Sequence, residues 1–284
     1  MTRYLRLLRI FLVNSLQLEM EYRANFAMDA LNALLAFGSG LLFLYAIFEH
    51  AESIGGWSFP QALALLGVFM ILEGFIELVL YPNLNSLPEY IRKGDMDFML
   101  LKPVSAQFLV SFRYIRLWKL PELATGVALL GYAMAALNTL TPATVALTVV
   151  LLVSAATIVY AIWCMLTTTA FWLVKVENLP EFFYSIFSAG RFPVSAFPTW
   201  ARFALTFIVP IAFVTTVPAS AAAGRLDGAM AAGSLLVAAL ALLLSHGLWR
   251  LAPYCAVKHG VLGRRELHER EQLILNRRRF PTVG

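Results

Sequence analysis

The 284-residue sequence is poor in charged residues and in cysteine. Charged side chains make up 14% of the chain, against about 25% in a soluble globular protein, while 60% of the residues are hydrophobic. The mean hydropathy of +0.73 excludes an ordinary soluble domain and indicates an integral membrane protein. Cys164 and Cys255 suit neither a metal site nor a redox motif, so no disulfide framework is expected.

The sequence also lacks the short motifs that bind nucleotides or support hydrolysis. No Gly-x-x-x-x-Gly-Lys-Ser/Thr phosphate loop, Gly-x-Ser-x-Gly elbow or His-Glu-x-x-His pair occurs, and the four histidines are scattered. We therefore predict that the chain is not an enzyme, and that it holds no catalytic residue, metal site or cofactor. Any energy source, such as ATP with magnesium, would have to be bound by a partner chain.

The basic residues favour contact with membrane lipid over nucleic acid. The net charge is +5, and in a membrane protein such an excess marks cytoplasmic loops that face anionic lipid. Near the N-terminus, Arg3, Arg6 and Arg9 recur every three residues among apolar side chains. No small-residue cleavage site follows them, so we predict an uncleaved helix that lies in the membrane interface before the first span.

Apolar segments of about 20 residues, enough to cross a bilayer, recur along the chain. The predicted spans are residues 26–48, 60–81, 120–137, 143–174, 177–197 and 228–251. Six Lys and Arg residues lie within 82–119, whereas the connections after the first and third spans carry none. The positive-inside rule therefore places residues 82–119 and both termini in the cytoplasm. The predicted fold is an all-α, multi-pass protein of the cell inner (plasma) membrane.

A seventh apolar stretch, residues 199–223, is not counted as a span. It is bounded by Pro198, broken by Pro210 and again by Pro218, and a seventh crossing would place the basic C-terminal tail outside. We predict instead a re-entrant pair of short helices on the outer side, with its irregular backbone buried against protein. This topology leaves Arg191 on the outer side of the membrane.

One long polar segment interrupts the apolar pattern after the second predicted span. Its framework of Pro88, Gly94 and Pro103 predicts a short helix, a glycine turn and a second short amphipathic helix. Between these residues the charges of both signs are concentrated. We interpret the segment as a handle on which a cytosolic partner pulls.

Glu73 and Glu77 are acidic residues inside the second predicted span. They are four residues apart and therefore share one helix face. A carboxylate at membrane depth costs about 2.5–3.5 kcal/mol on insertion scales, so both are expected to face the protein interior. Two interpretations stay open: the pair lines a path for a cationic or polar substrate, or it is protonated or paired with a neighbouring helix.

Three segments carry a likeness to a known family. They are residues 21–26 before the first span, residues 91–105 after the second and the proline-rich run 192–218 before the last. In combination they resemble the permease subunits of type-2 ABC exporters, in the branch whose genes commonly encode two different permeases and one ATPase. The likeness covers residues 1–255 and leaves out the basic tail, residues 256–284, which is expected in the cytoplasm.

The resemblance implies an interfacial N-terminal helix, six spans, a coupling helix in the first cytoplasmic loop and re-entrant helices before the last span. Two permeases, identical or homologous, would pair, and each would contact an ABC ATPase subunit that holds ATP and magnesium. The residues implied to couple to that subunit are Pro88, Glu89, Arg92, Lys93, Gly94, Asp95 and Asp97. A second, smaller contact is implied at residues 175–180.

The expected function is that of a non-enzymatic permease subunit in ATP-driven export. It would move a hydrophobic or amphipathic compound out across the inner membrane, with a mild preference for a cation because of Glu73. The alternative is an assembly or interaction subunit of an envelope complex that moves no substrate. Arg92 and Lys93 fit either a protein partner or acidic headgroups, whereas anionic lipid would repel Asp95 and Asp97.

Overall fold

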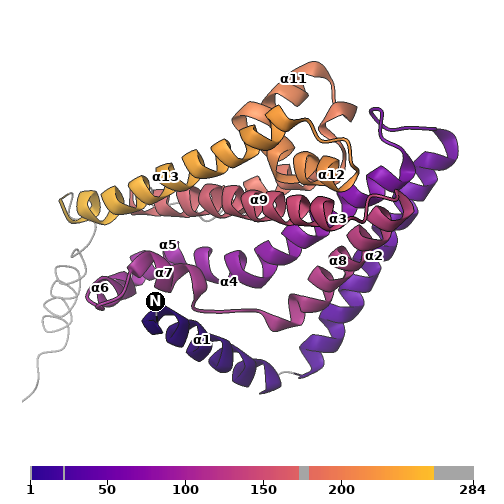
Figure 1. Cartoon of the computed structure of the whole chain (residues 1–284). Helices are drawn as coiled ribbons and strands as arrows, with labels where there is room; N and C mark the ends of the chain where they lie inside the picture. Colours follow the sequence, from indigo (N-terminus) through magenta and orange to yellow (C-terminus); the bar gives the residue numbers. More distant parts are fainter. Residues whose placement is uncertain (1, 22, 173–178, 259–284) are drawn as a thin grey trace, which may run out of the picture.

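The structure is a computed structural model, and it describes residues 2–21, 23–172 and 179–258 (Figure 1). Helices make up the regular structure of these residues, apart from one isolated antiparallel bridge between Ile54 and Trp57. The predicted all-α fold is therefore confirmed for the described part of the chain. The basic tail that was predicted from residue 256 onward lies almost wholly outside it.

The helices follow one another along the chain with short connections. The first half of the chain has α1 (Thr2–Glu21), α2 (Arg23–His50), α3 (Phe59–Phe75), η1 (Ile76–Leu80), α4 (Tyr81–Leu84), α5 (Leu87–Lys93), α6 (Asp95–Leu100), α7 (Ala106–Phe112), η2 (Leu117–Lys119) and α8 (Leu120–Ala136). The second half has α9 (Pro142–Thr168), η3 (Thr169–Phe171), α10 (Leu179–Phe187), η4 (Ser188–Arg191), η5 (Val194–Ala196), α11 (Thr199–Phe203), η6 (Ala204–Ile208), η7 (Ala212–Thr216), α12 (Val217–Ala222) and α13 (Gly228–Lys258). The η segments are short 3₁₀ or π helices.

The described residues contain four helices that are long and apolar enough to cross a membrane, or five if the bent pair within residues 199–222 counts as one span. These four correspond to the predicted spans 26–48, 60–81, 143–174 and 228–251. The predicted third span is α8, whose 17 residues fall short of the roughly 20 that cross a bilayer unaided. The chain is thus a multi-pass membrane protein, and the count of six spans stays a prediction.

The predicted fifth span, residues 177–197, is not one continuous helix. From Leu179 onward the chain forms α10 and then two short 3₁₀ segments, η4 and η5. Phe192 adopts an extended backbone, with φ −112° and ψ 147°, because the ring of Pro193 disfavours a helical conformation in the preceding residue. The α-helix α10 has already ended at Phe187, and Pro193 ends the 3₁₀ segment η4 that follows it.

The chain between Ser195 and Arg225 starts and finishes at the same end of the bundle. The Ser195 hydroxyl donates to the Gly55 carbonyl at 2.7 Å, and the Arg225 guanidinium donates to the Gly56 carbonyl at 2.9 Å. Within this stretch the helices bend by 79° between residues 208 and 212. This path agrees with the predicted re-entrant pair. We call this end, with the turn at Gly55, the loop end, and the opposite one the α5–α6 end.

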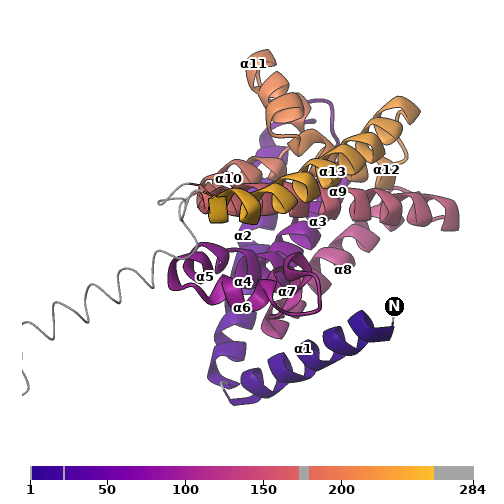
Figure 2. The same ribbon diagram turned by 90° about the vertical axis from the view of Figure 1, so that its left-hand side faces the viewer.

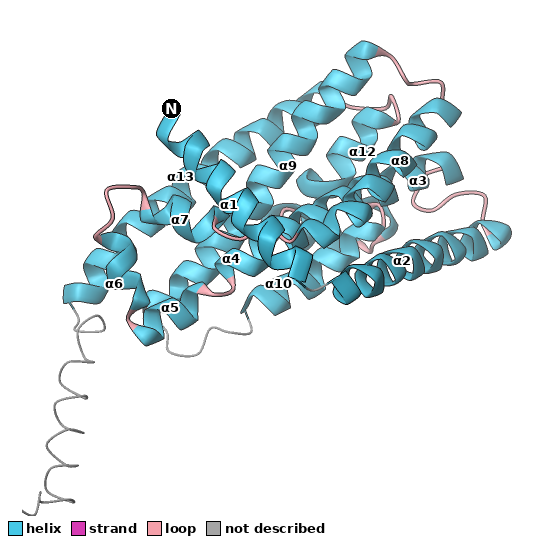
Figure 3. Ribbon diagram, turned by 90° about the horizontal axis from the view of Figure 1, so that it is seen from below, coloured by secondary structure: helices cyan, strands magenta, loops and turns pink. Residues whose placement is uncertain are grey.

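The core is built around α3, which packs mainly against α8, while α9 packs mainly against α13 (Figures 1 and 2). Small residues allow α3 and α8 to approach closely. A Cβ atom on Gly67 would lie 2.8 Å from the backbone nitrogen of Leu130, and one on Gly126 would lie 2.8 Å from that of Ile71. In contrast, α2 lies at the edge of the bundle, and most of its described apolar side chains are exposed (Figure 3).

We expect Gly126→Ala to destabilise the protein because its methyl group would press on the backbone of α3. Overpacking of this kind costs about 1–3 kcal/mol, which should lower the Tm in detergent micelles by several degrees. Gly131→Ala is the matched control, since a Cβ atom at Gly131 on the same helix meets nothing within 4 Å. Equal Tm values for the two variants would contradict the close approach of α3 and α8.

Candidate functional site

The predicted site residues fall into two groups, a charged turn at the α5–α6 end and a set of carboxylates on α3, η1 and α8. The charged turn comprises residues 88–97, where α5 and α6 meet beside α7 (Figure 1). α5 ends at Gly94, whose φ of 76° lies in the left-handed region that favours glycine. Asp95 and Asp97 stand in the first turn of α6, where carboxylates stabilise the helix dipole.

The charged turn has one buried apolar face and one exposed polar face. Leu87 and Ile91 of α5 and Met96 and Met99 of α6 are buried. The exposed charged residues are Glu89, Arg92, Lys93, Asp95 and Asp97. Lys93 forms an ion pair with Glu89 one helical turn away. The five charged residues among the predicted coupling residues are therefore accessible, whereas Pro88 and Gly94 are half-buried, and their role in coupling stays a prediction.

Two large apolar residues that were not predicted extend this surface. Phe98 is 69% exposed and Leu101 is 81% exposed, although both follow the charged residues directly. They are three residues apart, so they share a helix face, opposite the buried Met96 and Met99. This spacing is visible in the sequence and could have identified them. Large exposed apolar side chains of this kind mark sites of contact with protein or membrane.

Two side-chain amides tie the segment before the charged turn to α9 and to the loop after α7. Asn85, just before α5, accepts a hydrogen bond from the indole nitrogen of Trp163 in α9 at 2.9 Å. Asn83 accepts from the backbone N–H of Tyr114 at 2.8 Å and donates to the Tyr114 carbonyl at 2.5 Å. Asn83 is 1% exposed, so these contacts are sheltered from water. A displacement of α5 would therefore act directly on α9.

Glu73 is paired within the chain. One of its carboxylate oxygens accepts a hydrogen bond from the Tyr184 hydroxyl at 2.9 Å and from the Arg191 guanidinium at 3.2 Å. That guanidinium also lies 4.9 Å from the ring centroid of Phe69 on α3. This geometry agrees with one of the two predicted interpretations of Glu73, in which it pairs with a neighbouring helix. The structure itself does not test a substrate path along the residue.

The contacts of Arg191 place its side chain beside the second half of α3. Phe69 and Glu73 are 10 and 14 residues beyond the start of α3 at Phe59, which corresponds to about 15–21 Å along the helix. Arg191 therefore reaches well into the apolar part of the bundle. The predicted location of Arg191 on the outer side of the membrane stays a prediction.

Glu77 interacts with residues at the start of α8. Its carboxylate lies 3.6 Å from Arg116 and 3.9 Å from Lys119, and Lys119 lies 3.6 Å from Glu122. Glu73 and Glu77 thus take partners from different segments, although they share a predicted helix face. The π-helical segment η1 starts between them and changes the regular spacing of α3. With the Glu73–Arg191 pair included, the ion pairs in this part of the described structure join three carboxylates and three cations. The carboxylates are Glu73, Glu77 and Glu122, and the cations are Arg116, Lys119 and Arg191.

The remaining predicted features give little further information. The second contact, residues 175–180, lies mostly outside the described residues. No group of three His, Cys, Asp or Glu side chains that could hold a metal ion occurs in the described ranges.

We expect Arg191→Gln to destabilise the protein more than its exposure suggests, because Glu73 would keep a charge without its cation. The side chain of Glu73 is 13% exposed, and loss of a hydrogen bond to such a charged group costs about 1–3 kcal/mol. The double variant Glu73→Gln/Arg191→Gln should recover most of the lost Tm in detergent. Arg202→Gln, which removes an exposed arginine that donates only to backbone carbonyls, is the control. Additive losses in the double variant would show that the pair is not coupled.

Residues 34–253 match a family model described as an ABC-2 family transporter protein. Comparison with curated proteins finds no match, and comparison with solved structures finds none either. The matched residues include both the charged turn and the carboxylates of α3, η1 and α8. Since the match covers well over half of the chain, the chain belongs to the ABC-2 family of transporter proteins, as its resemblance to type-2 ABC permeases predicted.

Proposed function

We propose that the chain is the permease subunit of an ATP-driven exporter of the inner membrane, coupled to a separate ATPase subunit through the charged turn. The observation that carries this proposal is the exposed charged turn of a family member whose sequence has no phosphate loop. Because the chain does not bind ATP by a recognisable motif, the motor has to act on it from outside. The basic residues within 82–119 favour a cytoplasmic location for the turn, where such a motor would lie.

A continuous series of contacts supports transmission of force from the charged turn to the interior. Asn85 contacts Trp163, and the Trp163 ring lies 6.4 Å from the ring of Tyr184 in an edge-on arrangement. Tyr184 in turn donates to Glu73. We propose that closure of the ATPase subunits displaces α5, and that α9 and α10 then move against α3 as packed units.

The transported compound is proposed to be hydrophobic or amphipathic and to pass between this chain and a second permease. In support, α2, α3 and α8 form an apolar groove of about 630 Å³ with Phe37, Leu41, Phe59, Leu129 and Tyr132 among its lining residues. This volume falls within the range of small-molecule sites, roughly 300–1,000 Å³. Arg191 already compensates the charge of Glu73, so the geometry adds no support for a cationic compound.

The proposal is tested by reversing the charge of the turn. The full chain is purified with its ATPase subunit in mild detergent, and ATP hydrolysis and transport are measured in reconstituted vesicles. We expect Asp95→Lys/Asp97→Lys to lower both ATPase retention and transport about tenfold or more, because like charges juxtaposed at an interface cost several kcal/mol. Insertion into the membrane should not change.

The matched control is Glu49→Lys/Glu52→Lys, which makes the same change of charge at exposed positions near the loop end. This variant should keep wild-type retention and transport. Unchanged transport by the Asp95→Lys/Asp97→Lys variant would contradict the proposed coupling surface. If the wild-type chain retains no ATPase subunit at all, the assembly or interaction subunit becomes the better description.

A further inference from the structure

The N-terminal helix α1 lies across the α6–α7 region at the α5–α6 end, outside the main bundle (Figures 1 and 2). Two kinds of contact hold it there. The ring of Tyr4 packs edge-on against Phe108 of α7, with centroids 4.9 Å apart. The hydroxyl of Ser15, a residue only 5% exposed, accepts a hydrogen bond from the backbone N–H of Ile115 at 3.1 Å. These contacts position α1 without filling the space beside it.

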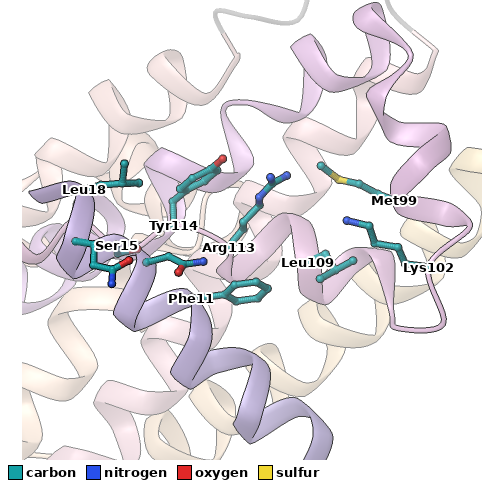
Figure 4. A pocket seen from close by; sticks show the side chains of 10 residues that line it. Phe11, Ser15, Leu18, Met99, Lys102, Leu109, Arg113 and Tyr114 are labelled. Atoms are coloured by element: carbon teal, nitrogen blue, oxygen red, sulfur yellow. The ribbon is translucent and has the colours of Figure 1, made fainter.

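A pocket of about 560 Å³ occupies the space between α1, α6 and α7 (Figure 4). Its lining includes two cations, Lys102 and Arg113, and it includes no carboxylate among the described residues. Asn14 and Gln17 of α1 add neutral amide donors, and Phe11 contributes an apolar wall. The Arg113 guanidinium lies 5.3 Å from the ring centroid of Tyr114, a cation–π contact that restricts its position.

We propose that this pocket binds the phosphate headgroup of an anionic phospholipid. Ammonium and guanidinium groups form charge-assisted hydrogen bonds with phosphate oxygens, and amide donors can satisfy the remaining acceptors. Toward the N-terminus of α1, Arg3 lies 11 residues before Asn14, and Arg6 lies 11 residues before Gln17. Eleven residues are three helical turns, so each arginine shares a helix face with its amide. The basic stripe of α1 therefore runs into the pocket and extends its positive potential.

The outer surface of α1 favours a lipid over an acidic protein segment as the occupant. Leu5, Leu12 and Leu16 are spaced at helical intervals and are 64%, 42% and 46% exposed. In a membrane protein, a helix with an exposed apolar row beside a basic stripe lies in the headgroup region, with the apolar row toward the acyl chains. The pocket on its basic side then opens at the level of the phosphates.

Lipid binding is tested with the full chain in detergent by native mass spectrometry, titrating phosphatidylglycerol and, separately, phosphatidylcholine. We expect preferential retention of phosphatidylglycerol. Lys102→Gln/Arg113→Gln should weaken it about 25-fold, or about fivefold for each basic residue near an anionic surface. The matched control Arg202→Gln/Arg250→Gln removes the same charge from exposed positions outside the pocket, and it should change retention less than about twofold.

Other outcomes would overturn the proposal. Lys102→Arg/Arg113→Lys keeps both charges and should retain the lipid, so a loss equal to that of the glutamine variant would indicate a fold defect rather than a binding site. Equal retention of the two lipids, or displacement of phosphatidylglycerol by excess inorganic phosphate, would assign the pocket to a different ligand. Loss of an ATPase subunit with full retention of lipid would make it a protein docking site. None of these readouts requires transport, so the inference stands or fails separately from the proposed function.

Discussion

The carboxylate of Glu73, inside a helix that is long and apolar enough to cross a membrane, imposes a constraint on much of the fold. An uncompensated charge there would be costly, and the chain removes this cost with the Arg191 guanidinium and the Tyr184 hydroxyl. Both partners come from the α10–η4 segment, so this segment must lie beside α3. Gly190, next to Arg191, lies so close to Thr215 that a Cβ atom would meet its methyl carbon at 2.9 Å. The ion pair thus also locates the bent segment that follows.

The same constraint links the interior to the charged turn. Tyr184 contacts Glu73 on one side and the ring of Trp163 on the other, and Trp163 donates to Asn85 just before α5. A polar group inside a membrane domain is commonly taken as a sign of a substrate path. Here the polar groups satisfy one another, and their arrangement connects the segments that a motor subunit would have to move. The contacts of Glu73 therefore make it a structural link between α3 and α10.

Some of this arrangement was predictable from sequence, and some was not. Length and apolar composition were enough for α2, α3, α9 and α13, and the prolines with the charge rule predicted the bent segment. The fifth span stays a prediction, and composition does not report that its described part divides into α10 and two short 3₁₀ segments. The ion pair of Arg191 was not predictable because the charge rule treats each cation alone, whereas this contact depends on a carboxylate 118 residues away. Contacts between distant segments of this kind leave no local pattern to read.

The charged turn and the lipid pocket share a supporting element, α6. Met99 of α6 lines the pocket, and its buried side chain also belongs to the apolar face that holds the charged turn in place. Lys102 follows α6 directly, so a headgroup bound there would bridge the end of α6 to α1. If α1 lies in the membrane interface as its basic and apolar residues predict, this bridge would hold one side of the turn at a constant depth relative to the membrane. Force applied to Asp95 and Asp97 would then rotate the charged turn about this fixed edge rather than displace the whole turn. The rotation would be transmitted through Asn85 to α9.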